Sequence, residues 1–583
     1  MCGIFSLLNI EKDNGYQFSS EFINQQFMKG VGRGPEHSVI TYYGSKAIFG
    51  FHRLAINGLD QESNQPIENG DIRLICNGEI YNYNEIYKEL NIEPKTNSDC
   101  EVIIHLYKRF GIERTLQILD GVFAFVLLDY NIHNENAKIY VCRDPYGVRP
   151  LYMLYPNENS NKRTPYYGFA SELKCLSEFQ HSITDYSIQH VKPGTYTTFE
   201  LSYKIQSEWK LIEKNKTYHI PSVIATQYNN FNYRIEIDNW IPILQKKLIQ
   251  AVEKRCVTTE RPIACLLSGG LDSSLITSLV NDFHVRNHLP VLETYSIGLK
   301  ESVDLKYAKI VANYLGTKHN EIVLTEEDFL NAIPEVIEKI ESYDTTSVRA
   351  SIGNYLLGKY IRANSDAKVI FNGDGSDELT GGYLYFNKAP TALDFDVECR
   401  RLLKDIHLFD VLRSDKCIST HGLEPRTPFL DREWVQIYLS IPYEIRFHTM
   451  HDEPEKHLLR STFSNYKGCN GKKLLPNNVL WRTKEAFSDG VSKSTRSLYE
   501  IIQEHVSKEF VSKNIQYTHL PPETLEQEYY RSIFESKYKG LGEIVPYFWM
   551  PKFIEGVKDA SARTLAIYQT INEKNKINKI EKI

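Results

Sequence analysis

The stretch PIACLLSGGLDSS, residues 262–274, joins a short apolar strand to the start of a helix through a loop of glycine and serine. Glycines let backbone N–H groups approach phosphate oxygens, and the N-terminus of the following helix adds its dipole. The loop lacks the GK[ST] sequence of a Walker A motif. A phosphate site is one interpretation of this loop, and a purely structural turn is the other.

Strand and helix patterns alternate around this loop, from about residue 238 to residue 373. A capping box from Thr325 to Asp328 begins one of the helices. Such alternation predicts a parallel sheet with helices on both faces and ligands beyond the C-terminal strand ends. The later chain is expected to be mainly helical. An amphipathic helix is expected at 241–256 and strands at 262–267, 293–299, 320–325 and 368–373.

A second glycine-rich loop, NGDGSDELTGGYLYF at residues 372–386, follows the last of these strands. It carries Asp374, Asp377 and Glu378 with no apolar period. Hard Mg²⁺ prefers carboxylate and phosphate oxygens, so an acidic loop near a phosphate loop favours a metal-nucleotide site. A solvated turn is the alternative interpretation.

The chain up to about residue 205 has short β-branched and aromatic runs separated by turns. One helix is expected to begin at Ser98, to pack with Phe110 on its apolar face, and to end at Gly111. Mostly antiparallel strands with a few helices predict an α+β layered domain. Strands are expected at 3–8, 47–56, 72–76, 122–129 and 139–142.

Cys2 directly follows the initiator methionine, whose removal would leave a thiol and a free α-amine on one residue. The amine has a reference pKa near ~8 and the thiol one of about 8.5, so the amine can act as the base that activates the sulfur. A cysteine at the second position is, by itself, more often chance than catalysis.

Other side chains in the first hundred residues have the types that a carboxamide hydrolase needs. Arg53 can bind an α-carboxylate through two hydrogen bonds. Glu79 and Asp99 can hold an α-ammonium group. The Asn77 amide and the Gly78 backbone N–H can form an oxyanion hole.

Several segments resemble, in order, the glutaminase domain of class II glutamine amidotransferases. They are MCGI, HRLAI, NQP at 64–66, NGEIYNY, SDCEVI, LDGVFAF and RDPYGVRPLY, and they cover most of the first 175 residues. The resemblance implies an αββα N-terminal-nucleophile sandwich in which mature Cys2 attacks glutamine. A domain that kept this fold but lost activity is the alternative. The implied glutamine-binding residues are Arg53, Leu54, Ile56, Asn77, Gly78, Glu79 and Asp99.

The loop SGGLDSS resembles the pyrophosphate loop of ATP pyrophosphatases, which split ATP between its α- and β-phosphates. This resemblance implies an adenine nucleotide α-hydrolase-like domain, with Asp272 and Asp377 serving Mg²⁺. The implied nucleotide-binding residues are Leu267, Ser268, Gly269, Gly270, Asp272, Ser273, Ile297, Gly373, Asp374 and Lys484.

Later segments resemble the asparagine synthetase family. They are YDTTSVRAS, GLEPRTPFLD, WRTKEAFSDGV, VPYFWMPKF and ASARTL, so the resemblance reaches about residue 568. It implies that Arg349 serves the aspartate and acyl-adenylate site, that Lys484 lies against pyrophosphate, and that Asp374 is a catalytic base.

Four positions depart from that family's pattern. Asn372 replaces the usual Ser, Asp374 stands where many members have Glu, Thr380 replaces a common Phe, and Val303 replaces Pro. The shorter acid at position 374 leaves open whether it fully takes over the role of Glu.

Composition excludes several other classes of protein. The net charge is −6 with no basic stripe, which argues against nucleic acid as a partner. No apolar stretch approaches the roughly 20 residues that span a bilayer, and the N-terminus lacks the pattern of a secretory signal. The ten cysteines lack CxxC pairs, as expected of a reduced, cytoplasmic chain.

The sequence therefore predicts an Ntn sandwich followed by an ATP-pyrophosphatase domain with helical extensions. The expected activity is glutamine-dependent asparagine synthesis from glutamine, aspartate and ATP with Mg²⁺, with an ammonia tunnel implied by the resemblance. One alternative is a related enzyme that amidates another carboxylate, and the second is a non-catalytic glutamine or nucleotide sensor. The oligomeric state stays open, a homodimer included. The predicted divisions are 2–205 (glutaminase), 206–237 (linker), 238–570 (synthetase) and 571–583 (disordered tail).

Overall fold

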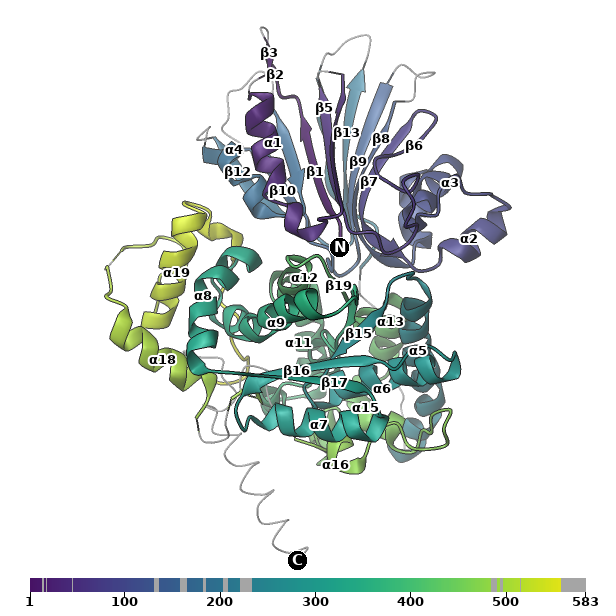
Figure 1. Cartoon of the computed structure of the whole chain (residues 1–583), viewed down its shortest axis with the longest axis vertical. Coiled ribbons are helices and arrows are strands. Elements are labelled where there is room, and N and C mark those ends of the chain that lie inside the picture. Colours follow the sequence, from purple (N-terminus) through teal and green to yellow (C-terminus); the bar gives the residue numbers. More distant parts are fainter. Residues whose placement is uncertain are drawn as a thin grey trace, which may run out of the picture.

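The structure of the protein is a computed structural model that places two domains along one long axis (Figure 1). The N-terminus lies at the junction between the domains. The described residues are 1–12, 15–16, 18–44, 46–130, 136–157, 165–181, 185–202, 208–220, 233–483, 490–492, 496–513 and 515–556.

In the described part of the chain, the N-terminal domain contains two six-stranded antiparallel sheets that lie face to face. Their strand orders are β12-β10-β11-β1-β5-β4 and β14-β13-β9-β8-β7-β6, and β2 and β3 form a separate hairpin. The strands are β1 Gly3–Leu8, β2 Glu11–Lys12, β3 Gly15–Tyr16, β4 His37–Tyr43, β5 Ala47–Arg53, β6 Ile67–Asn69, β7 Ile72–Ile80, β8 Gly121–Asp129, β9 Asn136–Arg143, β10 Tyr152–Pro156, β11 Tyr167–Ala170, β12 Tyr186–His190, β13 Thr195–Ser202 and β14 Lys210–Thr217.

Helices cover the outer face of each sheet and complete the predicted αββα sandwich. In β1, Phe5 and Leu7 face the helical layer, whereas Ile4 and Leu8 face the second sheet. This alternation explains why the strand is apolar apart from Ser6, since successive side chains point to opposite, equally buried faces. The helices are α1 Ser20–Met28 and α4 Ser177–His181 on the first sheet, and α2 Tyr83–Leu90 and α3 Val102–Ile118 on the second.

The second domain is built on a parallel sheet of strand order β17-β16-β15-β18-β19 among the described residues. In β15, Ala264 and Leu266 pack with the α8–α9 side, whereas Ile263 and Cys265 pack with α5 and α6. The sheet is therefore covered on both faces, as predicted. Its elements are α5 Tyr233–Val257, β15 Ile263–Leu266, α6 Leu271–Arg286, β16 Glu293–Leu299, α7 Val303–Leu315, β17 Lys318–Leu324, α8 Glu326–Ile340, α9 Thr345–Asn364, β18 Val369–Phe371 and β19 Glu424–Arg426.

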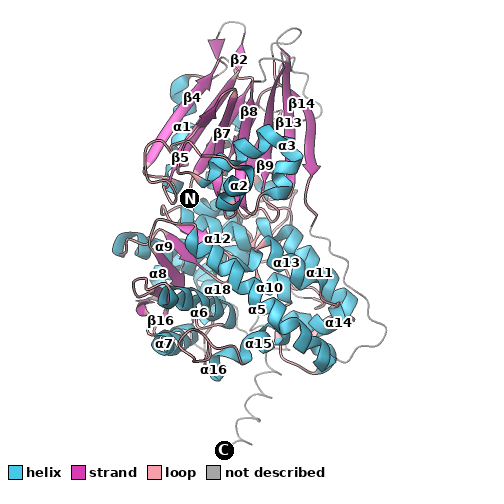
Figure 2. Ribbon diagram, turned by 90° about the vertical axis from the view of Figure 1, so that its right-hand side faces the viewer, coloured by secondary structure: helices cyan, strands magenta, loops and turns pink. Residues whose placement is uncertain are grey.

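Helices dominate the remaining chain and surround the parallel sheet (Figure 2). Each described helix is too short or too polar to span a bilayer. These helices are α10 Ser376–Thr380, α11 Ala392–Asp405, α12 Asp410–Ser419, α13 Arg432–Ser440, α14 Tyr443–Arg446, α15 His457–Ser464, α16 Asn477–Leu480, α18 Leu498–Glu509 and α19 Leu525–Lys537. The 3₁₀ turns are η1 Val31–Arg33, η2 Asp99–Glu101, η4 Leu173–Cys175, η5 Leu384–Lys388, η6 Ile406–Leu408, η7 Pro428–Leu430, η8 His448–His451 and η9 Gly542–Ile544.

Local signals had mixed outcomes. The Thr325–Asp328 capping box is present. Gly111 interrupts the helix as predicted: it adopts a non-helical conformation with a φ of 73°, and a second helical segment follows the kink and ends at Ile118. Phe110 is 43% exposed rather than packed, because the kink follows directly after it. Strand β14 lies inside the segment predicted as a linker, where it pairs with β13. The predicted tail and the ASARTL segment lie outside the described residues.

Candidate active sites

Cys2 lies immediately before β1, at the junction of the two domains. Its Sγ is 3.6 Å from the carbonyl oxygen of Leu54, which follows β5. Its own carbonyl oxygen accepts a hydrogen bond of 2.9 Å from Nε of Arg33. Sequence reasoning did not single out Arg33, although its place between two glycines in VGRGPE is typical of a constrained turn.

Asn77 and Gly78 lie on β7 beside Cys2. In the orientation that satisfies its neighbours, the Asn77 amide donates to the Cys2 carbonyl oxygen at 3.0 Å and accepts from Arg33 at 3.3 Å. A Cβ at Gly78 would lie 2.6 Å from the carbonyl oxygen of Val122, so only glycine fits. The structure thus places Asn77 against the Cys2 backbone, with Gly78 next to it on the same strand.

A loop after β5 fixes the predicted carboxylate-binding arginine. Arg53 is 7% exposed, and its Nη1 donates to Asp60 O at 2.8 Å and to Asn64 Oδ1 at 2.7 Å. Leu54 and Ile56 are buried on the following residues. The guanidinium is therefore held in one orientation before any substrate binds.

The two predicted ammonium-binding carboxylates are buried close to one another. Glu79 accepts from Asn57 Nδ2 at 2.7 Å and lies 3.4 Å from Arg426 of the second domain. Asp99 accepts from the backbone N–H of Ile80 at 2.7 Å. Burial raises the pKa of Glu79 well above its usual range and that of Asp99 to about 6. The positive charge of a bound ammonium group would offset the free-energy cost of ionising these buried carboxyl groups.

Met1, which precedes the nucleophile, is itself buried. Its residue is 1% exposed, and burial lowers the pKa of its α-amine to about 6. Burial also raises the pKa of the Cys2 thiol. A basic α-amine thus already lies beside the thiol, one residue before the position that catalysis would require.

The second candidate site is a cavity of about 220 Å³ at the C-terminal ends of the parallel strands. Gly269 does not line it: its φ is 74° and a Cβ there would meet Ala308 N at 2.4 Å, so it packs against α7. Lys484 lies outside the described residues. The predicted residues that line the cavity are Leu267, Ser268, Gly270, Asp272, Ser273, Ile297, Gly373, Asp374 and Asp377.

The SGGLDSS loop is ordered by its own hydroxyl groups. Ser268 Oγ and Ser273 Oγ are 2.9 Å apart, and Gly270 N donates to Ser268 Oγ at 3.3 Å. Gly270 then begins α6, whose N-terminus faces the cavity. A Cβ at Gly373 would lie 2.7 Å from Ser273 N, so the acidic loop packs directly against the phosphate loop. Together they suit a nucleotide phosphate.

The two predicted metal ligands converge on one cation. Lys456 Nζ lies 2.6 Å from Asp272 Oδ2 and 2.6 Å from Asp377 Oδ1. Sequence reasoning missed Lys456, whose partner Asp272 is 184 positions away. Among the described residues no three His, Cys, Asp or Glu side chains form a metal cluster. Two converging carboxylates fit Mg²⁺ when substrate phosphates complete its coordination.

Asp374 lies in the same cavity and retains an unused acceptor. Its Oδ2 is buried without a hydrogen-bond partner among the described residues. Arg413 Nη2 is 3.9 Å from its Oδ1 and also pairs with Asp410. Asp410 in turn accepts from Gly375 N at 3.2 Å. Helix α12 thereby holds the acidic loop and contributes a cation that the motifs did not reveal.

Arg349 does not line this cavity, in contrast to its predicted direct role. It is 4% exposed, and its Nε donates to Glu526 Oε1 at 2.8 Å. Glu526 belongs to α19, 177 positions later in the chain, so sequence spacing could not reveal the pair. The neighbouring residues Thr346 and Ser347 of α9 do line the cavity. Arg349 therefore positions the helix that forms the wall.

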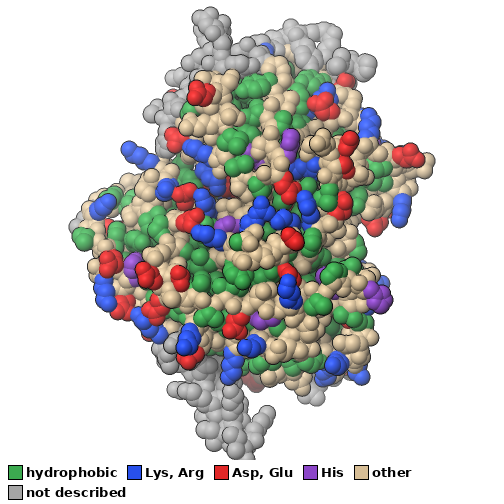
Figure 3. Space-filling model, viewed as in Figure 1, with side chains coloured by type: hydrophobic (Ala, Val, Ile, Leu, Met, Phe, Trp, Pro, Cys, Tyr) green, Lys and Arg blue, Asp and Glu red, His purple; other side chains and the backbone are tan. Residues whose placement is uncertain are grey.

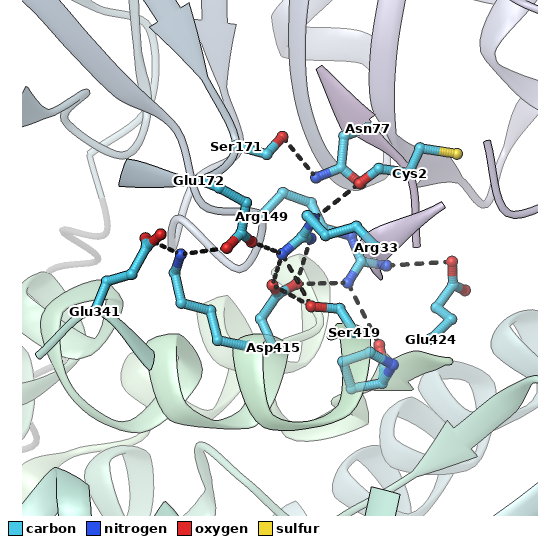
Figure 4. A network of polar contacts seen from close by, with 12 residues as sticks. Cys2, Arg33, Asn77, Arg149, Ser171, Glu172, Glu341, Asp415, Ser419 and Glu424 are labelled. Carbon is cyan, nitrogen blue, oxygen red and sulfur yellow. Dashed lines mark hydrogen bonds and ion pairs between the residues drawn. The ribbon is translucent and has the colours of Figure 1, made fainter. Parts of the chain in front are cut away.

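A buried polar network joins the two sites across the domain junction (Figure 4). Arg33 Nη1 lies 2.8 Å from Glu172 Oε1 and 2.7 Å from Asp415 Oδ2. Glu172 belongs to the first domain and Asp415 to α12 of the second. Lys416, also on α12, pairs with Glu341 and lies 3.4 Å from Glu172. One helix therefore contacts the surroundings of both candidate sites.

Comparison with known proteins identifies both domains. The glutamine amidotransferase domain family matches residues 1–233, and the asparagine synthase family matches residues 244–398 and 387–544. Asparagine synthetase (glutamine-hydrolysing) of Rattus norvegicus is 40% identical over 98% of this chain and 99% of its own length. The corresponding proteins of Homo sapiens and Gallus gallus are 39% and 38% identical, with the same coverage.

These relatives share about two fifths of their residues with this chain over almost its whole length. The chain belongs to the family of glutamine-hydrolysing asparagine synthetases.

Proposed function

We propose that this chain is a glutamine-dependent asparagine synthetase that forms asparagine, glutamate, AMP and pyrophosphate from glutamine, aspartate and ATP. The observation that carries the proposal is that one chain contains two candidate active sites. One lies around Cys2, and the other lies around Asp272 and Asp374. The glutaminase domain is assigned to residues 2–205, extended through β14, and the synthetase domain to residues 238–570. The reduced cysteines fit a cytoplasmic location.

In the first centre, removal of Met1 gives Cys2 its own α-amine. The amine takes the thiol proton, the sulfur attacks the glutamine amide carbon, and the proton passes to the departing ammonia. Asn77 and Gly78 stabilise the oxyanion, while Arg53 holds the α-carboxylate. Water then cleaves the thioester, which releases glutamate and restores the thiol.

In the second centre, the aspartate β-carboxylate attacks the α-phosphorus of ATP and pyrophosphate leaves. The N–H groups of the SGGLDSS loop hold the phosphates. Mg²⁺, held by Asp272 and Asp377, would supply charge neutralisation at the phosphates. Ammonia attacks the acyl carbon, AMP leaves, and the free Oδ2 of Asp374 accepts the proton from nitrogen. Lys484 at the pyrophosphate stays a prediction.

Arg413 is the cation best placed to bind the aspartate α-carboxylate. It lines the cavity next to Asp374, whereas Arg349 lies outside the cavity lining and pairs with Glu526. Ammonia is proposed to pass between the centres along the domain junction, where Cys2 lies. Enclosure of that route would keep water from the acyl-adenylate.

The proposal is tested with amide-¹⁵N-glutamine, ATP–Mg²⁺ and a panel of acceptor acids. Mass spectrometry should show ¹⁵N-asparagine, with AMP and pyrophosphate formed one-to-one with it. If another acid is amidated and aspartate is not, that acid is the substrate in place of aspartate. Formation of ADP and orthophosphate would overturn the adenylate mechanism, and binding without turnover would favour the sensor.

A further inference from the structure

A second cavity, of about 380 Å³, lies between the two domains, and its lining includes neither Cys2 nor residues of the phosphate and acidic loops. The first domain contributes the end of α1, η1 and η4 to its wall. The second contributes α8, α9 and the turn after α12. Neither of the proposed reactions uses this cavity.

The lining side chains are strongly cationic. Lys29 and Lys174 come from the first domain, and Lys339 and Lys359 from the second, with Glu335 as the sole carboxylate among the described lining residues. Figure 3 shows Lys and Arg side chains gathered at the waist between the domains. Folding thus brings like charges together from separate elements, which is unfavourable without a counter-charge.

The carboxylates near this cavity do not fully neutralise the positive charge of its lysines. Lys29 is 3.7 Å from Glu178, and Lys359 is 3.7 Å from Glu335, both longer than a charge-assisted hydrogen bond. Lys174 is closely paired with Glu172 at 2.6 Å and serves the buried network instead. The ammonium groups of Lys29 and Lys359 are therefore the ones with most to gain from an added anion.

The rest of the wall also favours an anion. Nε2 of His421 is buried without a hydrogen-bond partner among the described residues. An amino acid would need a counter-charge for its ammonium group, and among the described lining residues only Glu335 offers a carboxylate. Lysines supply point charges and N–H donors without the planar fork that matches a carboxylate, and they are common phosphate ligands. The volume lies within the range of small-molecule sites.

We propose that this cavity binds a small phosphate-bearing polyanion, which bridges the two domains through Lys29 and Lys359. The ligand would be either a free polyphosphate or the phosphate tail of a nucleotide. Arg33 also lines the cavity, and its Nε holds the Cys2 carbonyl oxygen. Occupancy therefore stabilises the junction at which the nucleophile lies.

The test is calorimetric titration of the full chain with inorganic tripolyphosphate, and separately with ADP, in the presence of a magnesium chelator. Lys29→Gln/Lys359→Gln removes the two ligands. Lys318→Gln/Lys508→Gln is the matched control, because Lys318 and Lys508 are exposed to a similar extent as Lys359 and form salt bridges of 2.7 Å. The phosphate loop provides a separate site that is the same in all three proteins.

We expect tripolyphosphate to occupy two sites in the wild-type and control proteins, with one site weakened at least tenfold in the cavity variant. If ADP also binds at the cavity, and that binding is weakened in the cavity variant, the cavity accepts nucleotides. If only tripolyphosphate binds there, the ligand is a free polyphosphate. Equal site numbers and affinities in all three proteins would overturn the proposal.

A second measurement needs no variant. Tripolyphosphate should slow acetylation of Lys29 and Lys359 in the wild-type chain several-fold relative to Lys318, as read by peptide mass spectrometry. Equal acetylation rates with and without the anion would also overturn the proposal.

Discussion

Arg33 Nη1 and Asp415 Oδ2 lie 2.7 Å apart although the residues belong to different domains. The same arginine donates to the carbonyl oxygen of Cys2. Asp415 lies on α12, whose Asp410 and Ser414 hold the acidic loop through Gly375 and Asn372. The two centres therefore share one helix as a support.

Asp415→Asn should impair glutamine hydrolysis even though residue 415 lies in the synthetase domain. The change leaves Arg33 and Arg149 with less compensating charge, and breaking a buried pair typically costs about 3–5 kcal/mol. We expect a fall in the free energy of unfolding and a roughly tenfold lower kcat/KM for glutamine.

Glu433→Gln is the control, since its pair with Lys247 is exposed and worth at most about 1 kcal/mol. Denaturant unfolding and glutamate release are measured for both. A destabilised Asp415→Asn protein with unchanged glutaminase kinetics would limit this pair to a structural role.

Cys2→Ala should abolish synthesis from glutamine and leave synthesis from ammonium salts intact. The reaction at Cys2 only releases ammonia from glutamine, and the second centre binds ATP and aspartate independently of it. An N-terminal extension that blocks the α-amine should have the same effect. Asparagine formation from each nitrogen source is the measurement, and full glutamine-dependent activity in either protein would remove Cys2 as an N-terminal nucleophile.

Asp374→Asn should lose most synthesis from both nitrogen sources, while adenylate formation declines much less. The amide cannot accept the proton that the attacking nitrogen must lose. Asp374→Glu is the matched variant and should retain appreciable activity. Pyrophosphate exchange is followed beside asparagine formation, and wild-type values for both in the Asn variant would place the base elsewhere.

Arg349→Lys should weaken synthesis sharply and leave glutaminase activity largely intact. Lysine keeps the charge but loses the planar contact with Glu526. Because the effect acts through the wall helix, Glu526→Gln should reproduce it. Arg413→Lys should instead raise the KM for aspartate. Aspartate saturation curves for the three proteins separate the roles, and wild-type synthesis by Arg349→Lys would show that Arg349 does not position the wall of the cavity.

Asp99 should make both stability and glutamine binding depend on pH. Its folded-state pKa of about 6 lies above the ordinary 3.8. The native state thus retains a proton that the unfolded state has lost, so the free energy of unfolding falls as pH rises through this window. Asp99→Asn should therefore be more stable at pH 7, on the order of 2–3 kcal/mol, with the difference vanishing near pH 4.

Glutamine binding should show the opposite preference for pH. The neutral carboxyl cannot pair with the substrate ammonium, so the KM for glutamine should rise below about pH 6 in the wild type. Asp328 is the contrasting acid, because its hydrogen bonds to Thr325 lower its pKa, and Asp328→Ala should lower stability at pH 7. Equal stability of Asp99→Asn and wild type from pH 4 to 7 would contradict this account.

Sequence patterns predicted the architecture well because the sheets that contain β1 and β15 are buried on both faces. β15 is apolar throughout and β1 is apolar apart from Ser6, and glycine loops lie where strands meet helices. Local patterns were less reliable at the end of the first domain, where β14 pairs with β13 inside the segment predicted as a linker. This pairing depends on neighbours in space rather than in sequence.

The same limit explains why Lys456 and Glu526 were missed. Lys456 contacts Asp272 across 184 positions, and Glu526 contacts Arg349 across 177. Neither pair has a spacing that a motif could reveal. Arg33 had a local signal in its flanking glycines, but its partner Asp415 is visible only in the fold.

The charges buried on α12 restrict how such an enzyme can be divided or recombined. A synthetase half made alone would expose Asp415 and Lys416 to water, and a glutaminase half would expose Arg33 and Glu172. A replacement partner from another source would have to bring complementary charges at each of these positions. The two domains are thus not interchangeable modules, and a functional domain exchange has to include the charged residues on both sides of the junction.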